Sequence, residues 1–192
     1  PILAISLPAI LTQLATPIGQ AWVTRSMAEY GEEAVAGMAI IGRLTPIAFG
    51  TIFALSGAVG PIIGQNYGAR DFNRVRRALY DALLFTGIVV VVATVILFFL
   101  RGHIAALFNA EGGSLSLIFL FCGPLALAFF FNGMLFVSNA CFNNLGRPFY
   151  STWLNWGRHT LGTVPLVWLG SILFGAPGVL IGQAAGGVFF GV

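Results

Sequence analysis

Long uncharged stretches alternate with short polar segments along this chain. The uncharged stretches are residues 1–24, 44–69, 82–100, 112–146 and 159–192. The hydrocarbon core of a bilayer is about 30 Å thick, and a helix of about 20 residues crosses it. The pattern predicts six membrane-spanning helices, with the last one truncated by the end of the sequence and separated from the fifth by Gly175–Gly178. The predicted spans are residues 3–25, 35–63, 78–100, 114–142, 150–172 and 176–192.

The apolar stretches are solid rather than alternating. Barrel strands alternate apolar and polar positions, whereas helices satisfy their backbone groups internally and tolerate continuous apolar runs. The pattern therefore predicts an all-α membrane protein. Pro1 opens directly into an apolar run with no basic segment before it, unlike a signal peptide, and Val192 ends another run. We expect the chain to be a fragment of a longer polytopic protein.

Composition supports a membrane protein. Of 192 residues, 58% are apolar and only 8% are charged, against about a quarter charged in soluble domains. These values exclude a soluble globular domain, a disordered tail and a disulfide scaffold. Cys122 and Cys141 would lie about 28 Å apart on one helix, too far to form a disulfide.

The basic residues are all arginines, and their placement predicts an orientation. The loops after the second and fourth spans carry five of them, against two in the loops after the first and third. Cytoplasmic loops are enriched in basic residues, so both ends of this segment are expected in the cytoplasm. The small net charge of +3 disfavours nucleic-acid binding. The five arginines are Arg70, Arg74, Arg76, Arg77 and Arg147.

The loop after the second span also has local structure signals. Gly68 suits the position just after a helix, and Asp71 suits the cap of the next helix. Arg77 and Asp81 are spaced for an ion pair. We interpret this basic segment as an anchoring face that sets topology, with contact to anionic lipids as the alternative.

Enzyme and metal signatures are absent from the sequence. There is no H-E-x-x-H, G-x-S-x-G or phosphate-loop motif. His103 and His159 fall on different predicted segments, so no metal or cofactor site and no catalytic residue is expected.

Polar residues inside the spans are the candidate site. Gln13, Thr16 and Gln20 recur on one face of the first span, and Asn132 and Asn139 are seven apart in the fourth. Such stripes face a bundle interior or a water-filled cavity, although each residue could instead only bond between helices.

Two arginines and the phenylalanines of the fourth span complete the candidate set. Arg43 and Arg158 lie inside spans, where they could reach toward the interface or line the cavity. No carboxylate lies deep in any span. Aromatic rings suit flat cations, which makes Phe129, Phe130, Phe131 and Phe136 candidate contacts, with packing as the alternative.

The chain resembles the carboxy-terminal half of a MATE (multidrug and toxic compound extrusion) transporter. The likeness covers essentially the whole chain and is most specific where G-Q-N-x-G-A precedes a basic cluster. Gly31–Gly37, Arg43-Leu44 and Leu145–Pro148 add to it. The matching residues of the specific element are Gly64, Gln65, Asn66, Gly68, Ala69, Arg74, Arg76 and Arg77.

The resemblance implies two six-helix lobes around a cavity that opens alternately to each side. It implies efflux of organic cations in exchange for protons or sodium, across a bacterial inner membrane. The partners would be a small organic cation, the bilayer and an amino-terminal lobe. Some members carry acidic residues where this chain has Thr16 and Asn132, so the coupling ion is expected to bind in the other lobe.

Two alternative functions stay open. A flippase of the same fold, which moves a lipid-linked saccharide, would use arginines such as Arg43 and Arg158 to bind pyrophosphate. A non-transporting membrane assembly module is the second alternative.

Overall fold

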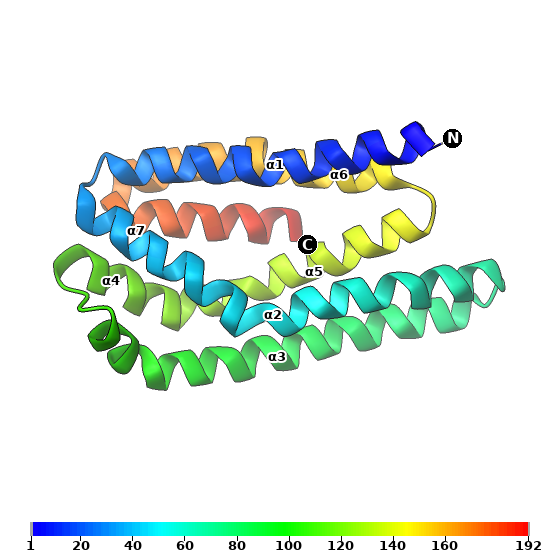
Figure 1. The fold of residues 1–192 in the computed structure, drawn as a ribbon, viewed down its shortest axis with the longest axis horizontal. Coiled ribbons are helices and arrows are strands. Elements are labelled where there is room, and N and C mark those ends of the chain that lie inside the picture. Colours follow the sequence, from blue (N-terminus) through cyan, green and yellow to red (C-terminus); the bar gives the residue numbers. More distant parts are fainter. Residues whose placement is uncertain (1, 192) are drawn as a thin grey trace.

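The protein is a bundle of long helices that lie side by side along its longest axis (Figure 1). The computed structural model describes the backbone of residues 2–191 and the side chains of residues 10, 11 and 13–191. No strand occurs within this described part, so the prediction of an all-α membrane protein is confirmed. The helices are α1 (Ile2–Ala28), α2 (Glu32–Gly68), α3 (Phe72–Leu107), α4 (Gly112–Leu120), α5 (Ala126–Asn144), α6 (Pro148–Gly157) and α7 (Val164–Gly191).

Two π-helical turns join shorter helices into longer rods. The turn η1 (Phe121–Leu125) connects α4 to α5, and η2 (Arg158–Thr163) connects α6 to α7. Pro124 lies within η1, and proline removes one backbone donor and disturbs the α-helical ladder. By length and composition, the described residues include four continuous helical stretches that can cross a membrane: Glu32–Gly68, Phe72–Leu107, Gly112–Asn144 and Pro148–Gly191.

The last of these stretches is two antiparallel rods rather than one. Gly175 has φ 65° and ψ −141°, which breaks the helix inside α7, and glycine adopts positive φ without steric cost. After this turn the chain returns along itself, and Gly178 packs directly on the backbone of Gly170. Gly182 and Gly186 then contact the backbone near Leu166 and Thr163. Small residues at every contact let the two backbones approach closely.

The helices extend beyond the apolar spans that hydropathy predicts, because local backbone motifs end them. Arg70, Asn109 and Gly146 have left-handed φ values of 58°, 46° and 73°. At each one the next N–H bonds back to a carbonyl five residues earlier, for example Asp71 N–H to the Asn66 oxygen at 2.9 Å. This is the Schellman arrangement.

The details of the loop between α2 and α3 correct one prediction and confirm two. Gly68 is still helical, and Arg70 takes the left-handed position, so the prediction for Gly68 is wrong. The Asp71 carboxylate accepts a bond from the Arg74 N–H at 3.1 Å and caps α3, as expected. The Arg77–Asp81 ion pair is also present, at 3.8 Å.

The main core lies between α2, α3, α4 and α5. Phe49 and Ile52 of α2 are fully buried there, together with Val90 of α3 and Leu117 of α4. Gly133 of α5 packs directly on Thr86 and Ile52, so the three helices approach closely. Cys122 and Cys141 are buried and free, which confirms that they do not pair.

The Glu33 carboxylate joins the starts of α2 and α4 at one end of the bundle. Glu33, in the first turn of α2, accepts a bond from the Gly113 N–H at 2.7 Å, where α4 begins. The first N–H groups of a helix have no partner within it and attract negative charge. Glu33 therefore fixes the start of α4 against the start of α2.

The contact between the two halves of α7 gives a stability prediction. Gly178→Ala would place a methyl group on the Gly170 carbonyl, and we expect a loss of about 1–3 kcal/mol, typical of overpacking. Thermal unfolding of the detergent-solubilised protein measures it. The control is Gly42→Ala, which meets no atom within 4 Å and should be neutral or slightly stabilising. Equal melting temperatures for the two variants would contradict this packing.

Candidate functional site

The polar stripe of α1 is exposed. Gln13, Thr16 and Gln20 all lie on the surface of this helical unit. The buried residues of α1 recur every four positions, at Ala15, Gly19, Val23 and Met27. That buried stripe packs α1 on α2, α6, η2 and α7. The three polar side chains are therefore available to something outside the unit.

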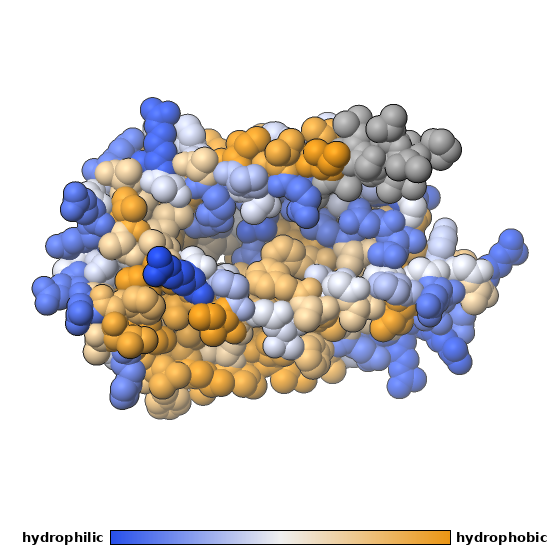
Figure 2. Space-filling view, viewed as in Figure 1, coloured by the Kyte–Doolittle hydropathy of each residue, from blue (hydrophilic) through white to orange (hydrophobic). Residues whose placement is uncertain are grey.

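Polar and apolar residues also occupy different parts of the molecular surface. In Figure 2, hydrophilic residues gather in a band between α1 and α2, whereas apolar residues cover α3 below them. Arg43 of α2 is exposed too, and it makes no ion pair with any described carboxylate. A polar band within the membrane layer is costly against lipid, so this face requires a protein or aqueous neighbour.

The two candidate asparagines of α5 are less exposed than the polar stripe of α1. Asn132 and Asn139 are partly buried, and the side-chain oxygen of each is enclosed without a hydrogen-bond partner. Asn132 lies against Gly187 in the second half of α7. Among the described residues, no hydrogen bond joins these amides to the exposed stripe of α1.

The candidate phenylalanines take part in an aromatic cluster between α2 and α5. Phe129 stacks on Phe49, with ring centroids 4.0 Å apart, and meets the edge of Phe53 at 6.1 Å. Phe136 contacts Phe53 at 5.1 Å. Because both residues also pack against the main core, their contacts here are structural.

The intramembrane arginine Arg158 and its neighbour His159 begin the π-helical turn η2. The Nε atom of Arg158 and both ring nitrogens of His159 are enclosed without a hydrogen-bond partner. The His159 ring packs directly on Gly19 of α1. Sequence reasoning noted the polarity of these two residues but missed the close contact, since nothing in the spacing links Gly19 to His159.

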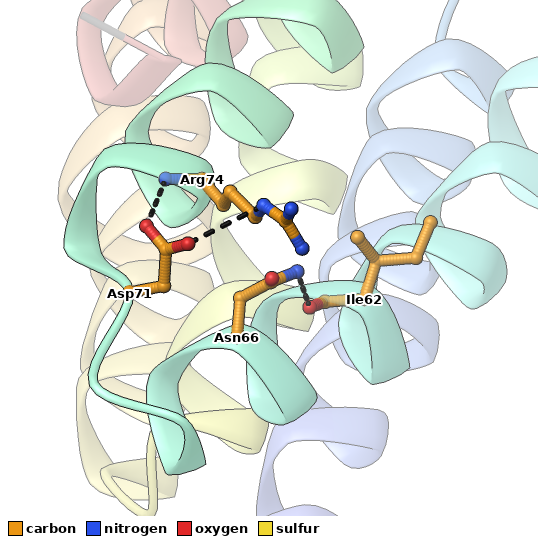
Figure 3. A network of polar contacts seen from close by, with 4 residues as sticks. All are labelled: Ile62, Asn66, Asp71 and Arg74. Carbon is orange, nitrogen blue, oxygen red and sulfur yellow. Dashed lines mark hydrogen bonds and ion pairs between the residues drawn. The ribbon is translucent and has the colours of Figure 1, made fainter.

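The G-Q-N-x-G-A element closes one end of the bundle. Figure 3 shows the Asn66 amide donating to the Ile62 carbonyl at 2.8 Å, one turn earlier in α2. Beside it, the Arg74 guanidinium pairs with Asp71 at 3.3 Å. Gln65 is exposed, as are Arg74, Arg76 and Arg77. The element therefore forms a capped, basic corner, and Gly64 packs on Asn144 of α5.

Two cavities lie on other sides of the bundle. One of about 690 Å³ lies between parts of α3 and α5, and its lining is almost entirely apolar, including Tyr80, Val91 and Phe130. The other, of about 320 Å³, lies between α1 and the α6–η2 segment and includes Arg25 and His159. No group of three or more His, Cys, Asp or Glu residues that could hold a metal occurs in the described part of the chain.

Comparisons with known proteins agree on one family. The MatE family model matches residues 8–169. An uncharacterised 21 kDa protein of Pseudomonas savastanoi is 36% identical over 94% of this chain and 60% of its own length. The FAD transporter of Shewanella oneidensis is 28% identical over 98% of this chain and 42% of its own length. This chain therefore spans about half the length of these relatives.

Solved structures share the fold. The Vibrio cholerae MATE transporter VcmN in its bent form superposes with a TM-score of 0.92 at 23% identity, over 98% of this chain and 43% of that protein. The chain thus corresponds to roughly one lobe of a MATE transporter.

A stability measurement tests whether the Phe129 ring is part of the packed core. Phe129→Ala removes the ring that stacks on Phe49, so we expect a loss of about 3 kcal/mol in the free energy of unfolding. Phe99, which is 75% exposed, is the matched control and should tolerate Ala with little change. Denaturant titration of both variants tests this, and equal stabilities would show that the Phe129 ring is not part of the core.

Proposed function

Because this chain belongs to the MatE family, we propose that it is the second lobe of a two-lobe exporter of organic cations. The export would be driven by exchange for protons or sodium ions. The observation that carries the proposal is the exposed polar stripe of Gln13, Thr16 and Gln20 on α1. Amide and hydroxyl groups at this depth are unfavourable against lipid, whereas they suit a water-filled cavity shared with an amino-terminal lobe.

The cavity would bind cargo by polar contacts and by shape. Exposed amides supply hydrogen bonds without a fixed charge, and the polar band between α1 and α2 runs along the length of the bundle (Figure 2). Rocking of the two lobes about this band would open it alternately to each side.

The coupling ion would bind in the other lobe. No carboxylate lies deep in any of the predicted spans, and proton or sodium coupling in membrane proteins uses carboxylates at that depth. We place the transporter in the bacterial inner membrane. Five arginines lie in the loops after α2 and after α5 or in the first turns of α3, and they favour the cytoplasm for those loops and for both ends of this segment.

A second candidate is an anionic cargo that carries a pyrophosphate, such as a lipid-linked saccharide. The exposed Arg43, without an ion-pair partner among the described residues, favours it, since guanidinium groups bind phosphates in a bidentate manner. The similarity to a FAD transporter supports the same charge class.

Retention of ethidium by drug-sensitive cells that express the full parent chain distinguishes these candidates. We expect lower retention than in cells with an empty vector, and loss of that difference when either the proton or the sodium gradient is collapsed. The gradient that matters identifies the ion. Unchanged retention under both gradients would contradict cation export, and translocation of a lipid-linked saccharide would then be measured, with Arg43→Gln as the variant expected to abolish it.

The lack of a carboxylate deep in any predicted span also predicts how Asn132→Ala behaves. Asn132 is a polar group inside the lobe but has no charge to exchange with an ion, so we expect the relative export of different drugs to change while the ion dependence stays. Drug-resistance profiles and gradient dependence of the same variant measure the two effects. Loss of proton or sodium dependence would show that this lobe takes part in coupling.

A further inference from the structure

Helix α2 runs parallel to the rod that α4, η1 and α5 form, and the two rods keep one register. Gly37 of α2 packs directly on Leu117 of α4. Phe49 of α2 stacks on Phe129 of α5, twelve residues further along each rod. Each position of α2 therefore lies at the level of the position 80 residues later in the chain, so that breaks at matching positions in the two rods lie side by side.

Both rods are broken at one such level, because this register places Pro46 within about 3 Å of the level of Pro124. Gly123, just before Pro124 in η1, has non-helical φ and ψ values of −105° and −112°. In α2, the Thr45 hydroxyl donates to the Ile41 carbonyl at 2.8 Å, a bond that often bends helices. Each proline also removes one backbone donor from its rod. Figure 1 shows both rods changing direction along their length.

Core packing does not explain these two prolines. Pro46 and Pro124 are both exposed, so neither ring fills a position in the core. Gly123 is buried, yet a Cβ atom there would meet no packed atom within 4 Å. A bend that served only packing would have filled surroundings. The free space beside the break instead leaves room for the rod to change its angle.

The segments beyond the two breaks are joined at their tips. The Glu33 carboxylate of α2 accepts the Gly113 N–H of α4 at 2.7 Å. Glu33 lies thirteen residues from Pro46, and Gly113 lies eleven residues from Pro124, which gives arms of about 20 and 17 Å. Because the arms have similar lengths, they can turn together while the contact between their tips is kept.

Helix α1 has a matching break. It ends at Ala28 and α2 begins at Glu32, so the end of α1 has to follow any movement of the α2 tip. The exposed Pro17 lies fourteen residues before Gly31, and Pro46 lies fifteen residues after it. Both prolines are therefore about 22 Å from this loop. A bilayer with its headgroups is about 40–45 Å thick, which places the breaks near its middle.

We propose that Pro46 and Pro124 form one hinge, about which α4 and residues 32–45 of α2 turn as a unit relative to the rest of the lobe. The motion lies within this lobe and is distinct from the rocking of two lobes about the polar band. A turn of about 20°, the size of a sharp helix kink, would move the tips by about 7 Å. Arg43, exposed on the moving segment, would be carried along the polar band.

Pulsed electron–electron distance measurements on the full parent chain in nanodiscs test the hinge. Nitroxide labels would be attached through Ser116→Cys on α4 and His103→Cys on α3, both exposed positions. We expect a distance distribution about 7 Å wide, which Pro46→Ala and Pro124→Ala each narrow by restoring a backbone donor. The matched control is Pro61→Ala, which makes the same change at an exposed position of α2 far from the hinge and should leave the distribution as it is.

A second pair of variants addresses the joined tips and leaves the prolines in place. Glu33→Ala removes the acceptor of the Gly113 N–H, so we expect the distance between labels at Ala39→Cys and Ser116→Cys to broaden. Glu32→Ala removes the neighbouring exposed carboxylate and should not broaden it. A single narrow distance between α3 and α4 in the otherwise unaltered chain, or equal effects of Pro46→Ala and Pro61→Ala, would overturn the proposal. Neither reading requires cargo or an ion gradient, so failure of the hinge is distinguishable from failure of cation export.

Discussion

Within a bilayer, every backbone N–H and C=O group must find its partner inside the protein, and the rest of this structure depends on that constraint. It makes helices the only way for these apolar stretches to cross. It also requires closed helix ends, and α2, α3 and α5 each end in the same Schellman arrangement, at Arg70, Asn109 and Gly146. Glu33 does the same for the start of α4 by accepting the Gly113 N–H.

Once the backbone is satisfied, helix association depends on close packing, because lipid tails are as apolar as the side chains they would replace. Glycines supply that packing at the seams: Gly133 against Thr86, and Gly170 against Gly178. The larger aromatic rings fill the space where helices diverge, as Phe49 and Phe129 do between α2 and α5.

The polar side chains that remain unpaired divide into an exposed set and an enclosed set. One set is exposed on the polar band and requires another protein surface or water. The other set is enclosed among the helices without a hydrogen-bond partner and includes the His159 ring nitrogens and the Asn132 side-chain oxygen. Polarity by itself therefore does not identify a cargo site in a membrane protein, since the direction of each side chain decides which neighbour it meets.

The sequence by itself determined the fold class, the approximate helices and the cap at Asp71, because apolar length and local hydrogen bonding are properties of short segments. It did not determine that Arg70 rather than Gly68 takes the left-handed position. The residue at which α2 ends depends on where α3 begins, and α3 begins directly after the cap at Asp71. It could not show that Gln13 is exposed whereas Asn132 is partly buried against Gly187, or that the His159 ring packs on Gly19. Those relations join residues far apart along the chain, and only the packing of α1, α5 and α7 in three dimensions decides them.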